Sequence, residues 1–404
     1  MAETKRKKQY LAVGGVFFLL IVIPLSLMAF LVANGMIKLG DTIKERTVSV
    51  LESQDEIKMR AINTADEVAN FLMECKKDLL VATIIPTTEA AYKQFIVENK
   101  KPLWVKENGK VQQVLSPLYK EISLTDKNGN ELIKIVDGQA VGAGQLANVS
   151  NPANTTFKTE DYFAKAKGLN KGEVYVSPVM GNYVDKTAFE KGQRFAGILR
   201  MTTPVFSKDG FAGVISVAID YRHLAKFTDQ IVPTQAERIF ETDAKTGNYA
   251  FMVDHRGFVI SHPNDYHIVG LDAQGNLVPA LTKENSAALT QKGQEVLNLN
   301  QLGFMDANLQ EIAKNAAAGK SGVATYKFAG NTKFVAYAPI KFYSANLTQP
   351  TGFGWVGLGV DVEKFNDAAK QATQKIQKEA KAWTATVILI IIISMIILFF
   401  IMVL

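Results

Sequence analysis

The chain has 404 residues, of which 48% are hydrophobic, and its formal net charge is +6. The excess positive charge lies mainly near the two ends, which argues against a broad basic surface for nucleic acid. A single cysteine, Cys75, excludes an intramolecular disulfide, so core packing must stabilise the folded part.

The first element that we predict is a transmembrane helix over residues 11–37. This stretch carries no charge and exceeds the roughly 20 residues that a helix needs to cross a bilayer. Residues 1–10 include four consecutive basic side chains at 5–8, which favour a cytoplasmic N-terminus. A cleaved signal peptide is the alternative, but the stretch is long for one and residues 31–33 form a poor cleavage site.

A long helix is predicted next, over residues 38–85. Between Gly40 and Pro86 there is no glycine or proline, and good helix formers dominate. Apolar residues form one stripe at helical spacing. They are Ile43, Val50, Ile57, Ala61, Ala65, Val68, Leu72 and Leu79. Such a helix can both pack a core and transmit a displacement from the membrane.

Two strand–turn–strand patterns follow, each with an aspartate three positions before a glycine. The pairs are Asp126 with Gly129 and Asp254 with Gly257, and a turn of this kind requires a positive φ at the glycine. The strands are predicted at 117–126 with 131–136, and at 249–254 with 258–261.

Each pattern is followed by a second strand pair, which makes an internal repeat. These pairs are predicted at 198–203 with 213–220, and at 333–338 with 354–361. A proline, Pro204 or Pro339, is predicted to end the first strand of each pair. The repeat predicts two antiparallel sheet units, at 86–240 and 241–365.

The chain closes with a second uncharged stretch, residues 383–404, which begins with the interfacial residue type Trp383. A Lys-rich connecting helix is predicted before it, at 366–382. We expect a second transmembrane helix here, and any kinase, cyclase or chemotaxis output module beyond residue 404.

Two mixed units along one long helix resemble the double Cache fold, tandem PAS-like sheets found outside the membrane in bacterial chemoreceptors, histidine kinases and cyclic-dinucleotide enzymes. The resemblance extends from Asp41 to about Phe365. Its most specific stretches are residues 160–166, 172–178, 198–204 and 213–220. It implies an α+β fold class: a long N-terminal helix and two tandem antiparallel sheet units, flanked by two transmembrane helices. It also implies homodimers and a small-molecule ligand in the membrane-distal unit, 86–240.

The amino-acid-binding subgroup of that family carries an Arg-x-Trp-Tyr sequence, a later tyrosine and acid, and a final-strand aspartate. Here Tyr162-Phe163 occupies the Trp-Tyr pair, but Glu160 stands at the arginine position. Tyr175 matches the later tyrosine, while Ser177 and Ala218 replace the two acids. The ligand is therefore predicted not to be a typical amino acid.

The resemblance places six candidate ligand-binding residues on these stretches. They are Tyr162, Phe163, Tyr175, Ser177, Arg200 and Thr202. The aromatic side chains could wall a pocket or simply pack a core. Arg200 could bind a carboxylate or phosphate, or lie solvated on an edge strand.

Catalytic and metal-binding motifs find little support. His255, His262 and His267 lie close together in sequence, but no known metal-ligand spacing is matched. The chain has no nucleophile elbow, phosphate loop or His-Glu-x-x-His sequence. We predict no enzymatic activity, no metal and no cofactor. Residues 298–306 are a candidate lining for a second pocket.

The sequence thus predicts a two-pass protein of a bacterial inner membrane, whose periplasmic region senses a small molecule. The alternative is a membrane-tethered assembly or adhesion module without a ligand.

Overall fold

The computed structural model describes residues 2–17, 19, 21, 23–107, 109–235, 237–328, 330–363 and isolated residues between 378 and 396. The chain divides into two compact units, and the second unit, Gln54–Val362, contains all of the sheets. The first unit combines residues 1–53 with 363–404.

The first unit contains helix α1, Ala2–Phe17, and the beginning of helix α2, Ile23–Ala82. Within the described residues, no helix combines the length and hydropathy needed to cross a bilayer. The predicted connecting helix, 366–382, and second span, 383–404, lie largely outside the described residues.

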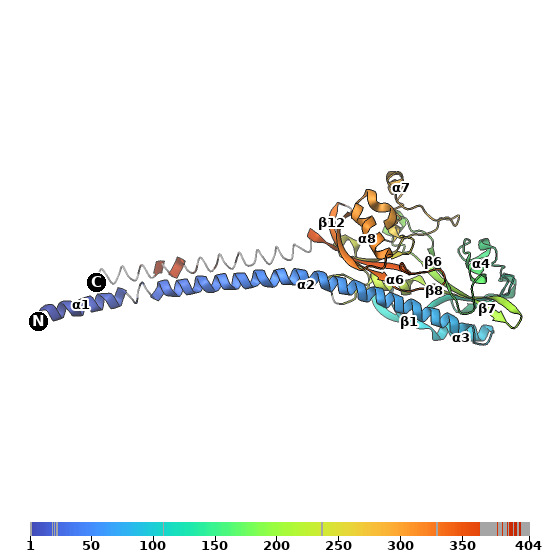
Figure 1. Ribbon diagram of the computed structural model, residues 1–404, viewed down its shortest axis with the longest axis horizontal. Helices are drawn as coiled ribbons and strands as arrows, with labels where there is room; N and C mark the ends of the chain where they lie inside the picture. The colour runs from blue at the N-terminus through green and yellow to red at the C-terminus, as the bar shows by residue number, and fades with distance from the viewer. Residues whose placement is uncertain are drawn as a thin grey trace. The chain divides into compact units, whose positions relative to one another are not determined.

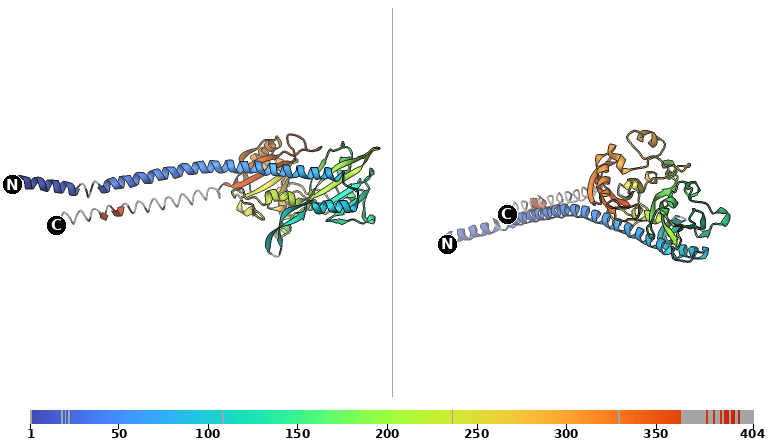
Figure 2. Two further views of the ribbon diagram at one scale, coloured as in Figure 1. Left: turned by 90° about the horizontal axis from the view of Figure 1, so that it is seen from below. Right: turned by 45° about the vertical axis from the view of Figure 1, so that its right-hand side comes forward.

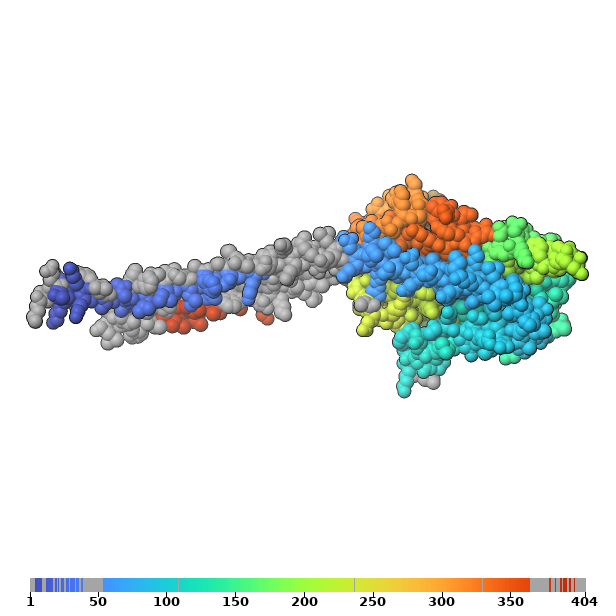
Figure 3. Space-filling model, turned by 60° about the horizontal axis from the view of Figure 1, so that its bottom comes forward, coloured from blue at the N-terminus to red at the C-terminus, as the bar shows by residue number. Residues whose placement is uncertain are grey.

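The part of α2 within the second unit confirms the predicted stripe from Ile57 onward, whereas the side chains of Ile43 and Val50 lie outside the described part. Its inward side chains are buried: Ile57, Ala61, Ala65, Val68, Leu72 and Leu79. The helix ends at Ala82, just before Pro86. Figure 2 shows this part of α2 passing alongside both sheets, and Figure 3 shows its outer face, in blue, at the surface of the unit.

Two large antiparallel sheets lie at the centre of the second unit, which also holds a small two-stranded sheet (Figure 1). The six-stranded sheet has the order β5 (Gln139–Ala140), β4 (Glu131–Val136), β3 (Tyr119–Thr125), β8 (Gly210–Asp220), β7 (Gly197–Ser207), β6 (Tyr175–Gly181). The five-stranded sheet has the order β10 (Val259–Ser261), β9 (Tyr249–Asp254), β13 (Gly354–Asp361), β12 (Asn331–Ile340), β11 (Gly322–Phe328). Apart from the short β5, both sheets order their strands second, first, fifth, fourth, third. The predicted repeat is confirmed in its topology.

The repeat also uses the same turn twice. Gly129 and Gly257 have φ angles of 88° and 90°, as the sequence pattern requires. Asp126 Oδ1 accepts bonds from the backbone N–H groups two and four residues later, and Asp254 Oδ1 does the same. The prediction that a proline ends each strand is wrong for β7, which continues past Pro204 to Ser207.

The remaining elements connect and cover the sheets. The helices are α3 (Glu89–Glu98), α4 (Tyr162–Lys167), α5 (Lys186–Glu190), α6 (Tyr221–Asp229), α7 (Ser286–Gln291) and α8 (Ala307–Ala317). Short 3₁₀ turns lie at Ala143–Gln145, Pro152–Asn154, Ala244–Thr246, Asp265–His267 and Leu299–Phe304. A hairpin, β1 (Lys100–Glu107) with β2 (Lys110–Pro117), was not predicted.

Three of the helices matter most for the packing. Helix α8 packs on the core of the five-stranded sheet, and α4 covers the six-stranded sheet. Helix α6 contacts strands of both sheets and therefore joins them.

Candidate functional site

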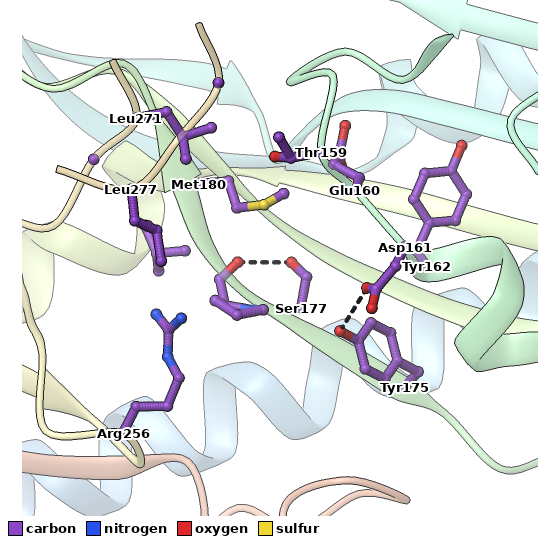
Figure 4. A pocket seen from close by; sticks show the side chains of 14 residues that line it. Thr159, Glu160, Asp161, Tyr162, Tyr175, Ser177, Met180, Arg256, Leu271 and Leu277 are labelled. Carbon is purple, nitrogen blue, oxygen red and sulfur yellow. Dashed lines mark hydrogen bonds between the residues drawn. The ribbon is translucent and has the colours of Figure 1, made fainter. Parts of the chain in front are cut away.

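A cavity of about 290 Å³ lies beside the edge strand β6 (Figure 4). Three parts of the chain line it. They are residues 159–162 at the start of α4, residues Tyr175 and 177–180 of β6, and residues Arg256, Gly270, Leu271, Gly275 and Leu277 from the second half of the chain. The six-stranded sheet, through β6, and a turn and a loop from the second half of the chain therefore supply walls of the same cavity.

The β6 wall is shaped by a local irregularity. The pairing of β6 with β7 shifts register between Val176 and Val179. Pro178, which lies in this bulge, has no N–H to donate, and an edge strand or bulge tolerates that loss. Ser177 Oγ donates to Pro178 O at 2.7 Å and accepts from Arg200 N at 2.9 Å. The bulge thus fixes the position of Ser177 in the wall.

Tyr175 and Asp161 supply polar groups on one side of the cavity. The hydroxyl of Tyr175 donates to Asp161 Oδ1 at 3.4 Å, a long bond that is drawn in Figure 4. Burial, and after it the charge of Asp161, raises the pKa of Tyr175. The phenol therefore stays protonated at neutral pH and can offer a hydrogen bond.

Arg256 supplies a cation from the turn between β9 and β10. Its Nε donates to Asp254 Oδ2 at 2.8 Å, which orients the side chain. In Figure 4 the guanidinium points into the cavity from one side, with Asp161 and Tyr175 on the other. The remaining donors of a guanidinium held in this way are suited to an anionic or carbonyl group.

A buried charge cluster lies behind the α4 wall. Arg200 Nε donates to Glu160 Oε1 and Arg200 Nη1 donates to Glu121 Oε1, each at 2.6 Å. The guanidinium also lies 4.6 Å from the ring centroid of Tyr162. Burial alone would raise the pKa of Glu121, but Arg200 and then Lys134 outweigh it, so the pKa is lowered. Glu160 and Tyr162 thus contact both the cavity and this cluster.

The structure separates the six sequence candidates into two groups. Tyr162, Tyr175 and Ser177 line the cavity. Phe163 packs against Phe211, with ring centroids 6.4 Å apart, and Arg200 and Thr202 are fully buried without lining the cavity.

The structure contradicts one of the two sequence interpretations of Arg200, and the ligand-binding interpretation stays a prediction. The solvated edge-strand interpretation is wrong, because its residue is 0% exposed and β7 lies between β8 and β6. Both of its ionic contacts go to carboxylates of this chain.

Sequence reasoning missed Asp161, Arg256 and the loop at 270–277. Asp161 lies inside the stretch 160–166 that carries the family resemblance, and this position is the signal that could have identified it. Arg256 lies in the second copy of the repeat, and nothing in the pattern predicts that it approaches β6.

A second, more open cavity of about 340 Å³ shares Tyr175 and Pro178 with the first. Its other walls include His255 and Asn346. The Asn346 amide accepts from Val176 N at 3.0 Å and donates to Val176 O at 2.9 Å. The loop before β13 is therefore attached to the free edge of β6.

The five-stranded sheet contains a small apolar cavity of about 30 Å³. Leu299 and Leu302 line it, so part of the predicted segment 298–306 does border a cavity. His262 also lines it and stacks edge-on against His267, with ring centroids 4.8 Å apart. Burial lowers the pKa of both histidines. No group of metal-ligating side chains converges in the part of the chain that the structure describes.

The sequence profile of one family, described as "Cache domain", matches residues 32–363. No curated protein matches the chain significantly.

Three solved structures illustrate the structural likeness. The extracellular domain of a proposed histidine kinase is 15% identical, with 82% of this chain and 99% of that chain covered and a TM-score of 0.48. A domain of a proposed sensory box/GGDEF family protein from Vibrio parahaemolyticus is 17% identical, with 78% and 98% covered and a TM-score of 0.47. The ligand-binding domain of a Pseudomonas aeruginosa amino acid chemoreceptor, in complex with GABA, is 15% identical, with 76% and 99% covered and a TM-score of 0.41.

Proposed function

The chain belongs to the Cache domain family, and from this premise we propose that it is the extracytoplasmic sensor region of a bacterial transmembrane receptor, either a chemoreceptor or a sensor histidine kinase. In this proposal the protein binds a small molecule and catalyses no reaction. The observation that carries the proposal is the cavity beside β6, which residues from both halves of the chain line.

The cavity has the properties of a small-molecule site. Its volume of about 290 Å³ is just below the range of roughly 300–1,000 Å³ for ligand pockets, which suits a small ligand. Apolar walls from Met180, Leu271 and Leu277 are combined with a few polar groups. Tyr162, Tyr175 and Ser177 are proposed to contact the ligand, and Arg256 to bind its anionic or carbonyl group. Phe163, Arg200 and Thr202 would support these contacts from behind.

Ligand binding between elements of both sheets gives a route for the signal. A ligand that binds one arrangement of the sheets better shifts the population toward that arrangement. We propose that 86–240 is the membrane-distal unit and 241–365 the proximal unit. Helices at 11–37 and 383–404 would cross the inner membrane and, with 38–85 and 366–382, carry the displacement within a homodimer.

The charges around the cavity bear on whether the ligand is an amino acid. Arg200 is already paired with Glu160, so its guanidinium is not available to bind a carboxylate of the ligand. This supports the prediction that the ligand is not a typical amino acid. Arg256 and Asp161 nevertheless place opposite charges at the cavity, so amino acids belong in the test.

A thermal-shift screen on the purified full chain tests the proposal. The panel contains organic acids, amines, purines, sugars and amino acids. A ligand at a hundred times its dissociation constant adds about 2.7 kcal/mol to the free energy of unfolding, which gives a measurable shift. We expect Tyr175→Phe and Arg256→Met to weaken the shift, and Lys208→Met, in an exposed turn, to leave it unchanged.

Other outcomes would change the assignment. A shift that both cavity variants retain would move the ligand to another site. A panel without any shift would favour the alternative, a membrane-tethered assembly or adhesion module.

A further inference from the structure

The junction between the two sheets contains two carboxyl groups without a direct cationic partner. Here the six-stranded sheet is called the first sheet and the five-stranded sheet the second sheet. Helix α6 follows β8 of the first sheet and contacts strands of both sheets. Asp229 is the last residue of α6, and Asp265 begins the 3₁₀ turn shortly after β10. Neither carboxylate forms an ion pair among the described residues.

Asp229 is bonded across the junction. Ser261 Oγ, from the last residue of β10, donates to Asp229 Oδ1 at 2.7 Å. Asp229 also lies at the C-terminus of α6, where the helix dipole disfavours a negative charge. The Ser261 bond favours an ionised Asp229, whereas the end of the helix opposes it, so the carboxyl group that joins α6 to the second sheet is under two opposing effects.

Asp265 is bonded in the opposite direction, from the second sheet back to the first. Its Oδ2 accepts from Phe195 N at 2.6 Å. The ring of Phe195 packs edge-on against the ring of Tyr221, the first residue of α6, with centroids 4.8 Å apart. The Tyr221 residue is 4% exposed, and its hydroxyl has no hydrogen-bond partner among the described residues.

The other charges that act on the two aspartates are Arg194 and Glu241. These two form an ion pair with each other at 2.6 Å, and both side chains are nearly half exposed. The positive charge of Arg194 is thus largely balanced by Glu241. Ionisation of Asp229 and Asp265 places two like charges, beside the uncharged Tyr221 phenol, at the contact between the sheets.

We propose that this junction is a proton-operated switch, in which protonated Asp229 and Asp265 hold α6 against the second sheet and their ionisation loosens that contact. The proton would then be a second input of the protein, independent of the small molecule bound beside β6.

The titration of the two groups falls in a useful range. Burial, and then the charge of Asp265, raises the pKa of Asp229 to about 7, against the effect of the Ser261 bond. Burial raises the pKa of Asp265 to about 6, against the effects of the Phe195 bond and Arg194. In the unfolded chain both carboxyl groups have a pKa of about 3.9. Their contribution to stability is therefore complete below about pH 4 and is lost as the pH rises through 6 to 7.

Spin labels on the full chain test the movement directly. The labels are attached at Lys167→Cys on α4 and Lys314→Cys on α8, both exposed positions, with Cys75→Ser in the background. We expect the distance distribution between the labels to differ between pH 5 and pH 8. The Asp229→Asn/Asp265→Asn double variant should show the pH 5 distribution at both values. Asp209→Asn, an exposed control, should behave as the wild type.

The melting temperature gives a second measurement. Between pH 5 and pH 8 the wild type should lose roughly 5 °C or more, and Asp265→Asn should lose less. This single variant replaces the double variant if the latter does not fold. The same label distances at pH 5 and pH 8 in the wild type would overturn the proposal, as would a full pH response in the asparagine variants.

Discussion

Glu160 and Arg200 form an ion pair with 2.6 Å between Oε1 and Nε, and each side chain is 1% exposed. Glu121 contacts the other side of the same guanidinium and is 4% exposed. The three groups form a buried unit, and the removal of one leaves an uncompensated charge or donor in the core. Because Glu160 also lines the cavity, the unit fixes the position of one wall.

Glu160→Gln should lower the free energy of unfolding by about 3–5 kcal/mol, the range for breaking a buried pair from one side. Chemical denaturation of the full chain measures this value. The matched control is Lys101→Met, which breaks the exposed pair with Glu74 at 3.1 Å and should cost less than about 1 kcal/mol. Equal losses in the two variants would contradict the structural role of the cluster.

Gly257→Ala should destabilise the protein more than Gly192→Ala. Both glycines have a positive φ, so both variants carry a backbone cost of about 1–2 kcal/mol. A Cβ at Gly257 would also lie 2.6 Å from Asn298 Oδ1, whereas a Cβ at Gly192 meets nothing within 4 Å. We expect a further loss of about 1–3 kcal/mol from this crowding, measured by denaturation. Asn300 Nδ2 is crowded as well, so equal losses would mean that both asparagines move aside freely.

Asn346→Ala should loosen the loop before β13 from β6. The variant removes both amide bonds to Val176, so we expect a loss of about 1–3 kcal/mol. Hydrogen exchange should show faster exchange at Val176 N–H, which the amide oxygen protects. Asn315→Ala, whose amide bonds only to an exposed glutamate, is the control and should leave this exchange rate unchanged.

His223→Gln should flatten the acid limb of the stability profile. Burial lowers the pKa of His223 to about 4, while the unfolded group titrates near about 6.5. Its stabilising contribution is complete above about pH 6.5 and is lost as the pH falls toward 4. Glutamine can keep the bond from Nε2 to Pro117 O, which spans 3.0 Å, without titrating.

The measurement is the difference in free energy of unfolding between the wild type and this variant at pH 6.5 and pH 4.5. Taking the difference isolates His223 from Asp229 and Asp265, whose contributions run in the opposite direction. A pH-independent difference would show that His223 does not stay neutral in the fold.

Much of the fold follows from local patterns in the sequence. The stripe on α2 and the Asp–Gly turns at 126–129 and 254–257 depend on spacing within one segment, and the structure confirms them. The hairpin of β1 and β2 was missed because its exposed strands lack a regular apolar alternation.

The candidate site could be predicted only in part. Tyr162, Tyr175 and Ser177 lie on a recognisable stretch, and they line the cavity. Arg256 and the loop at 270–277 reach it through the packing of one sheet beside the other. That packing is a long-range property, which no local pattern encodes.

The corresponding edge strands of the two sheets have different environments. Along β6 the loop residues Asn346 and Leu271 occupy backbone groups that would otherwise be open, the latter through Leu271 N to Gly181 O at 2.9 Å. Strand β11, its counterpart, has a partner on one side only. Uncovered strand edges recruit other chains and cause aggregation. The second half of the chain therefore covers part of the β6 edge, and a fragment that ends before residue 241 should self-associate through β6.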